Sequence, residues 1–203
     1  MNTAYITSFV IGGMVLLSIL TMNFSISQNS TELALQRNMK QHVNTVADMV
    51  SHDFAKIGYN WMGKINNPIQ SADSNKIVFM SNIDNDSSND AETVTWTFGT
   101  SSVSSTSNPN DYVLTRLIVL GSTTINKTDI TLGVTKFSLS YYDTVGSTTP
   151  MSTPVANPED IRQIEIEVVL QSKDKFKATS GSPGRYITST WHKRFSPINI
   201  QDN

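Results

Sequence analysis

The stretch that most constrains this chain is an uncharged, largely apolar run at its N-terminus. No charged residue occurs between Met1 and Thr31, and the densest apolar part runs from Ile6 to Leu20 before fading at Ile26. A helix rises about 1.5 Å per residue, so about 20 apolar residues cross the hydrocarbon core of a bilayer. We therefore expect residues 4–26 to lie in a membrane or to pack among sibling helices.

An amphipathic stripe continues this run. Six apolar residues recur at steps of three and four, which is typical of one face of a helix: Met39, Val43, Val46, Val50, Phe54 and Ile57. The spacing predicts one long helix over residues 1–57, ended by Gly58, with its second half packed on the chain's own sheet. The polar residues from Thr21 to Ser30 have low helix propensity, so this section is expected to fray most easily.

The remaining residues, 58–203, have the pattern of an antiparallel β domain. Alternating apolar and polar residues predict strands at 76–83, 93–98, 111–120, 134–142, 161–170 and 186–195, with loops at 99–110 and 147–158. No strand alternates with a helix, so a parallel sheet is not expected. Tyr59 and Trp61 are predicted to anchor the helix end on this domain. The predicted fold class is therefore α+β.

Charge and composition exclude some classes of partner. The net charge is −2, only 16% of residues are charged, and no basic block occurs, so we expect no nucleic-acid partner. Cysteine is absent, which rules out disulfides and thiolate sites. A surface rich in Ser, Thr and Asn suits an extracytoplasmic domain.

Four stretches, taken in order, carry a family resemblance. They are Ala47–Tyr59 (ADMVSHDFAKIGY), Glu92–Phe98 followed by Leu114–Arg116, Val134–Asp143, and Pro158–Ile166. The chain resembles the type IV pilin and type II secretion pseudopilin superfamily, particularly its larger minor members. The resemblance covers nearly the whole chain and implies a pilin-like fold, in which a long helix lies on an antiparallel sheet.

Two features of the N-terminus differ from the family pattern. The usual leader motif, a basic residue and glycine before Phe-Thr-Leu-x-Glu, has no counterpart here. Tyr5 stands where a mature pilin has the glutamate that pairs with a neighbour's N-terminal amine. Because some members at filament tips lack this glutamate, a minor, tip or accessory subunit is expected rather than a repeating major one.

The resemblance implies assembly of a pilus or pseudopilus filament with other pilin-like subunits. The residues expected to contact the membrane or sibling helices are Ile6, Phe9, Val10, Ile11, Gly12, Gly13, Val15, Leu16, Leu17, Ile19 and Leu20. The β domain would be extracytoplasmic, at the cell surface or in a periplasmic filament, and would offer lateral contacts or an adhesive surface. The positive-inside rule, applied to Arg37 and Lys40 alone, would instead place that side in the cytoplasm.

Candidate chemistry in the β domain is sparse. Asp84, Asp86, Asp90 and Glu92 form an acidic loop and a weak candidate for binding Ca²⁺, but the EF-hand spacing is absent and a solvated hairpin turn is the favoured interpretation. His42 and His52 are about 15 Å apart along a helix, too far to share a metal. No catalytic or nucleotide-binding motif occurs, so neither enzymatic activity nor a cofactor is expected.

Three alternatives to a filament subunit remain open at this stage. The chain could be a bitopic binding or adhesion module that never polymerises. Its apolar run could be a cleaved signal peptide, although no Lys or Arg precedes the run and Ser25-Ile26-Ser27 is a poor cleavage site. A secreted hydrolase with a cleaved signal would fit the composition alone.

Overall fold

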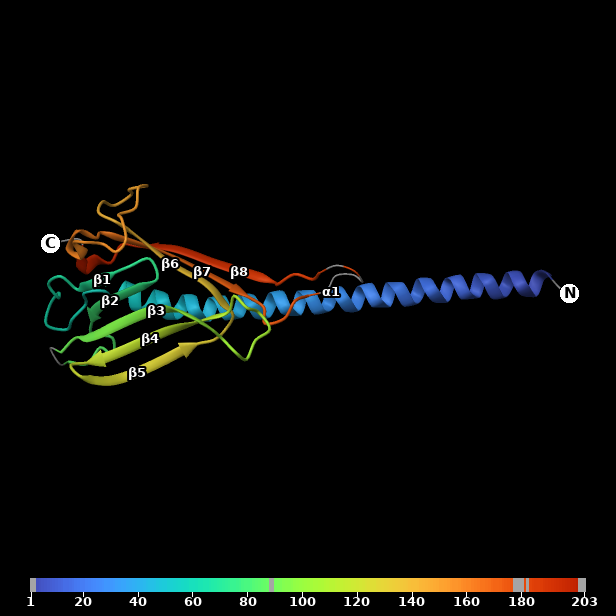
Figure 1. Ribbon diagram of the computed structural model, residues 1–203, viewed down its shortest axis with the longest axis horizontal. Helices are drawn as coiled ribbons and strands as arrows, with labels where there is room; N and C mark the ends of the chain where they lie inside the picture. Colours follow the sequence, from blue (N-terminus) through green and yellow to red (C-terminus); the bar gives the residue numbers. More distant parts are fainter. Residues whose placement is uncertain (1–2, 88–89, 177–180, 182, 201–203) are drawn as a thin grey trace.

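The computed structural model describes residues 3–87, 90–176, 181 and 183–200, and it consists of one long helix with a β domain at its C-terminal end (Figure 1). The helix, α1, runs unbroken over Thr3–Ala55. The strands are β1 (Ile69–Ala72), β2 (Lys76–Ser81), β3 (Glu92–Ser102), β4 (Tyr112–Leu120), β5 (Thr123–Ile130), β6 (Val134–Tyr142), β7 (Gln163–Gln171) and β8 (Thr188–Phe195). Two 3₁₀ turns, Pro158–Asp160 and Ile198–Ile200, complete the described elements.

The strands form two antiparallel sheets. The larger has the order β1-β2-β3-β4-β5, and the smaller has the order β6-β7-β8. Two backbone hydrogen bonds join the sheets: the N–H of Leu139 in β6 donates to Ser74 in the β1–β2 turn, and the N–H of Val155, in the loop after β6, donates to Ala72 of β1. The predicted α+β fold, a long N-terminal helix packed on antiparallel strands, is confirmed.

The C-terminal half of α1 lies across these sheets. All six stripe residues, from Met39 to Ile57, are at most 5% exposed. Phe54 packs its ring against Phe79 of β2 and Phe195 of β8, with centroids 5.6 and 5.8 Å apart. One helix face therefore closes the core of both sheets at once.

Several predicted boundaries were wrong. The helix ends at Ala55, two residues early. Strand β3 continues to Ser102, into the predicted loop. Strand β1 was missed because it is only four residues long, and β5 because both of its faces are polar and exposed nearly throughout.

Gly58 lies in the turn that follows α1, three residues beyond the helix end, and its surroundings explain why glycine is needed there. Its φ is +76°, and an added Cβ would lie 3.0 Å from side-chain carbons of both Asn199 and Pro68. We expect Gly58→Ala to lower the free energy of unfolding by about 2 kcal/mol, because the left-handed conformation and the crowding both oppose a side chain. Urea denaturation measures this loss. Gly146→Ala, at a similar φ of +83° with open space around it, is the matched control and should cost about 1 kcal/mol.

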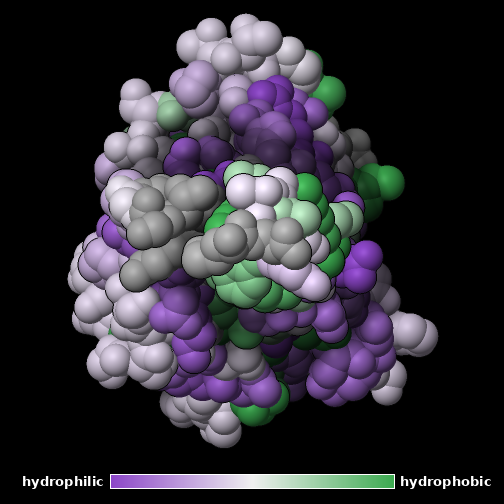
Figure 2. Space-filling view, turned by 90° about the vertical axis from the view of Figure 1, so that its right-hand side faces the viewer, coloured by the Kyte–Doolittle hydropathy of each residue, from purple (hydrophilic) through white to green (hydrophobic). Residues whose placement is uncertain are grey.

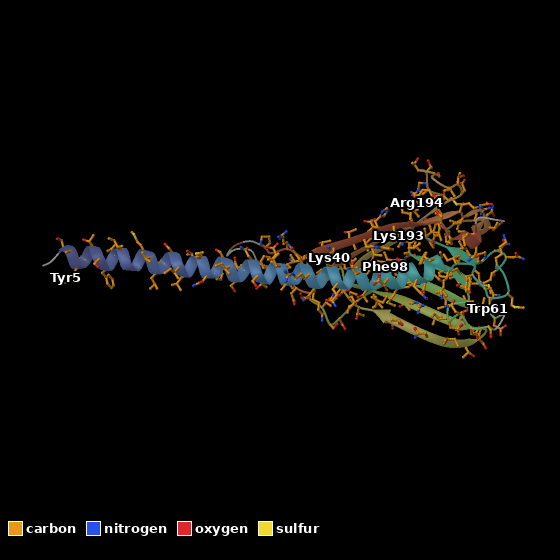
Figure 3. The ribbon with its side chains drawn as sticks, turned by 180° about the vertical axis from the view of Figure 1, so that it is seen from behind. Tyr5, Lys40, Trp61, Phe98, Lys193 and Arg194 are labelled. Carbon is orange, nitrogen blue, oxygen red and sulfur yellow. The ribbon has the colours of Figure 1, made fainter. Side chains whose placement is uncertain are left out.

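The predicted aromatic anchor holds for only one of its two residues. The Tyr59 side chain is half-buried, which fits the prediction, and its backbone carbonyl separately accepts a hydrogen bond from the N–H of Asn82. Trp61 is 58% exposed at the end of the domain farthest from the N-terminus (Figure 3). The turn after Gly58 directs Trp61 outward, so the prediction for this residue was wrong.

Candidate functional site

The N-terminal half of α1 projects from the domain without any cover. Within the described residues, α1 is the helix long and apolar enough to cross a membrane, and none of its most apolar window is buried. Figure 2 looks along the helix from its N-terminal end and shows its apolar surface surrounded by the hydrophilic surface of the β domain. Such a contiguous apolar surface is expected to contact lipid or another protein.

Every residue predicted to contact membrane or sibling helices lies on this projecting segment and is exposed. They are Ile6, Phe9, Val10, Ile11, Gly12, Gly13, Val15, Leu16, Leu17, Ile19 and Leu20. Phe9 is the extreme case, at 83% exposed. The side chains point to all sides of the helix (Figure 3), so the apolar surface is not confined to one face. This all-round pattern is typical of a helix buried in lipid or in a bundle.

Four hydroxyl side chains of the segment are hydrogen-bonded within the helix. Thr7, Ser18 and Ser25 each donate to the backbone carbonyl four residues earlier, at 2.7 to 3.0 Å, and Thr21 donates three residues back at 2.9 Å. A hydroxyl that is already bonded costs less to place in an apolar medium. The apolar character of the segment is therefore not interrupted by these residues.

Gly12 and Gly13 form a notch on one side of the segment. The notch is bordered by Tyr5, Phe9 and Leu16. A Cβ added at either glycine would meet nothing within 4 Å, so packing within the chain does not require glycine here. Small residues do permit close approach of a second helix.

A buried ionic cluster fastens the other end of α1 to the domain. The Asp53 carboxylate, which is fully buried, accepts hydrogen bonds from Arg116 Nε and Nη2 at 2.6 and 2.7 Å. It also accepts one from Trp96 Nε1 at 2.9 Å. Trp96 in turn stacks on Phe137 of β6, with ring centroids 6.2 Å apart. One carboxylate thus connects α1, β3 and β4, and through Trp96 it reaches the second sheet.

A second charged cluster lies on the small sheet. Glu165 of β7 pairs with His192 Nε2 at 2.9 Å and with the guanidinium of Arg194, and it accepts the Tyr142 hydroxyl at 3.1 Å. The Arg194 guanidinium lies 3.8 Å above the Tyr142 ring. The hydrogen bond from His192, followed by those from Arg194 and Tyr142, lowers the pKa of Glu165 to about 2.

This lowered pKa predicts that the stability of the β domain falls in acid. The folded state favours the Glu165 carboxylate, so its stabilisation is complete above the ordinary pKa of 4.5 and is lost as the pH falls towards 2. We expect Glu165→Gln to cost about 1–2 kcal/mol at pH 6 and to flatten the loss of stability between pH 4.5 and 2, as followed by urea unfolding at each pH. Glu167→Gln, on the same strand and paired with Lys136, is the control and should change stability by less than about 1 kcal/mol.

The candidate calcium residues serve the β2–β3 turn instead of converging. Asp84 Oδ1 accepts the backbone N–H of Asp86 at 3.1 Å, and the buried Glu92 accepts that of Ile83 at 2.8 Å. No group of three or more His, Asp or Glu side chains suited to a metal occurs in the described ranges, which include Asp90. The three histidines lie apart: His52 beside Asp53, His192 beside Glu165, and His42 ten residues before His52 on α1.

Comparison with known proteins found no related protein. No protein-family model matches the chain, and neither a curated protein nor a solved structure shows significant similarity.

Both charged clusters were missed by the sequence analysis. Asp53 and Arg116 belong to stretches that carry the family resemblance, and Trp96 lies in the predicted strand 93–98, but no pattern placed the three together. The sequence signal that exists is weak: an acidic residue on the apolar side of the helix stripe, and an arginine on the inward-facing side of a strand.

Proposed function

We propose that this protein is a membrane-anchored structural subunit of a pilin-like or pseudopilin-like filament. The observation that carries the proposal is the division of one helix into two halves. The C-terminal half is fastened to the domain by the Met39–Ile57 stripe and the Asp53 cluster, whereas the N-terminal half is apolar on all sides and uncovered. A helix of this kind needs lipid before assembly and sibling helices after it.

The architecture also supports the finer part of the proposal. One long apolar N-terminal helix followed by an antiparallel β domain is compatible with the pilin-like arrangement that the sequence resemblance implies. In a filament, the notch at Gly12 and Gly13 would allow close helix packing, and the β domain would supply lateral contacts outside the helical core. We assign the subunit a minor, tip or accessory position, because the sequence resemblance is to the larger minor members of that superfamily.

The proposal is tested by removing residues 1–28. The remaining chain keeps the Met39–Ile57 stripe and the buried ionic cluster at Asp53. We therefore expect a folded, soluble, monomeric domain that no longer enters membranes or filaments. Light scattering, far-UV circular dichroism and immunogold labelling of filaments measure these three properties. The proposal would be wrong if the truncated protein were still found in filaments. A full-length protein that anchors but never co-assembles would favour the non-polymerising binding module.

A further inference from the structure

The end of the β domain nearest the projecting segment carries an excess of positive charge. Arg37 and Lys40 on α1, and Lys173, Lys175 and Arg185 between β7 and β8, are all exposed there. We call these five residues the basal collar. The same two stretches, 32–42 and the described part of 172–187, contain only two acidic residues, Glu32 and Asp174. The collar therefore has a positive balance in a chain whose net charge is −2.

The collar is held in place by contacts between the β7–β8 connection and α1. Phe176 and Arg185 exchange backbone hydrogen bonds of 2.8 and 2.9 Å, and Arg185 pairs with Glu32 of the helix. Leu35 and Met39 of α1 line the same groove as Lys173 and Lys175. The collar residues of the connection thus lie beside the helix at residues 32–42.

Local partners leave most of this charge uncompensated. Among the described residues, Arg37, Lys40 and Lys173 form no ion pair. Asp174 Oδ1 accepts the hydroxyl of Ser107 at 2.9 Å. Asp111 lies buried near Lys173 and attracts its charge, so most of the uncompensated charge belongs to Arg37, Lys40 and Lys175. Lys175 Nζ lies 5.5 Å from the centre of the Tyr186 ring, which leaves its charge free to act outward.

The helix length sets the height of the collar above a bilayer. The uncharged part of α1, Thr3 to Thr31, extends about 43 Å. A bilayer with its headgroup layers is about 40–45 Å thick. If the apolar residues up to Ile26 occupy the hydrocarbon, Glu32 and its partner Arg185 lie at the outer edge of the headgroups, within about one Debye length of lipid phosphates.

We propose that the basal collar binds the anionic phospholipid headgroups of the bilayer that α1 crosses. The collar would hold the β domain upright on the membrane surface until the subunit leaves the bilayer. This inference rests on the membrane insertion of α1 in the proposed function. Basic residues near an anionic surface each strengthen the contact about fivefold at physiological salt.

The absence of cysteine allows a direct test in the full-length chain. A fluorophore on Asn38→Cys, at the collar, is quenched by nitroxide-labelled headgroups in vesicles of phosphatidylcholine or of an equal mixture with phosphatidylglycerol. We expect stronger quenching in the mixture, and loss of the difference near 1 M salt, where the Debye length is about 3 Å. The variant with both Lys173→Gln and Lys175→Gln should lower the equilibrium constant for binding of the collar to the anionic surface about 25-fold.

Two controls separate the outcomes. The variant with Lys64→Gln and Lys127→Gln removes the same charge elsewhere in the β domain and should leave the quenching unchanged. A second fluorophore, on Val15→Cys, reports bilayer insertion: failure there overturns the membrane step of the proposed function. If Val15→Cys reports insertion but quenching at Asn38→Cys is the same with and without phosphatidylglycerol, only the proposed binding of headgroups by the collar is overturned. Quenching that follows protein density instead of lipid charge would assign the collar to a neighbouring copy, which also overturns the inference.

Discussion

Asp53→Ala is expected to lower the free energy of unfolding by about 3–5 kcal/mol, the cost of removing one partner from a buried ion pair. The Arg116 side chain is only 14% exposed, and both of its bonds to the carboxylate would be lost. Trp96 Nε1 would also lose its acceptor inside the core. The variant leaves a buried cation and a buried donor without partners, and this penalty, more than the lost attraction, makes the effect large.

The measurement is urea unfolding of the detergent-solubilised chain, followed by tryptophan fluorescence. Asp48→Ala, an exposed aspartate on the same helix, is the matched control and should stay within about 0.5 kcal/mol of the parent. Asp53→Leu combined with Arg116→Met should recover most of the loss, because an apolar pair of similar volume leaves no unpaired charge. A cost below about 1 kcal/mol for Asp53→Ala would show that the cluster does not hold the helix to the sheets.

The sequence predicted those parts of the fold that depend on local periodicity. The helical stripe from Met39 to Ile57 and the alternation of β7 both face a large core, so burial imposes a clear period on them. Strand β5 has no such period, because almost all of it is exposed on both faces and its residues could equally form a loop. Its place in the sheet comes from pairing with β4, which no local pattern records.

The charged contacts were beyond prediction for a different reason. Asp53 and Arg116 are 63 positions apart, and their meeting depends on how α1 crosses the larger sheet. The Arg185–Glu32 pair joins residues 153 positions apart and depends on where the β7–β8 connection lies along the helix. Hydrophobic pattern determines which faces are buried, but not the register between a helix and a sheet. The contacts that fix this register are therefore found only in the structure.

Leu16→Arg is expected to abolish membrane anchoring and, with it, any assembly that starts from the membrane. Leu16 lies near the middle of residues 4–26 and is 58% exposed, so the new guanidinium would have no partner within the chain. An arginine in place of leucine at the centre of a membrane helix costs about 3–4 kcal/mol on the insertion scale. The β domain is remote from this position, so its stability to urea should not change.

Leu33→Arg makes the same exchange on the same helix, at a site that is 54% exposed but beyond the apolar run. The measurement is the share of protein that stays with membranes after carbonate extraction, scored beside filament recovery. We expect Leu16→Arg to lose both and Leu33→Arg to keep membrane association, because only the first places a charge in hydrocarbon. If Leu16→Arg stays in the carbonate-resistant fraction, the projecting segment does not span the bilayer. Retention in filaments without membrane association would mean that sibling helices, and not lipid, are what this segment needs.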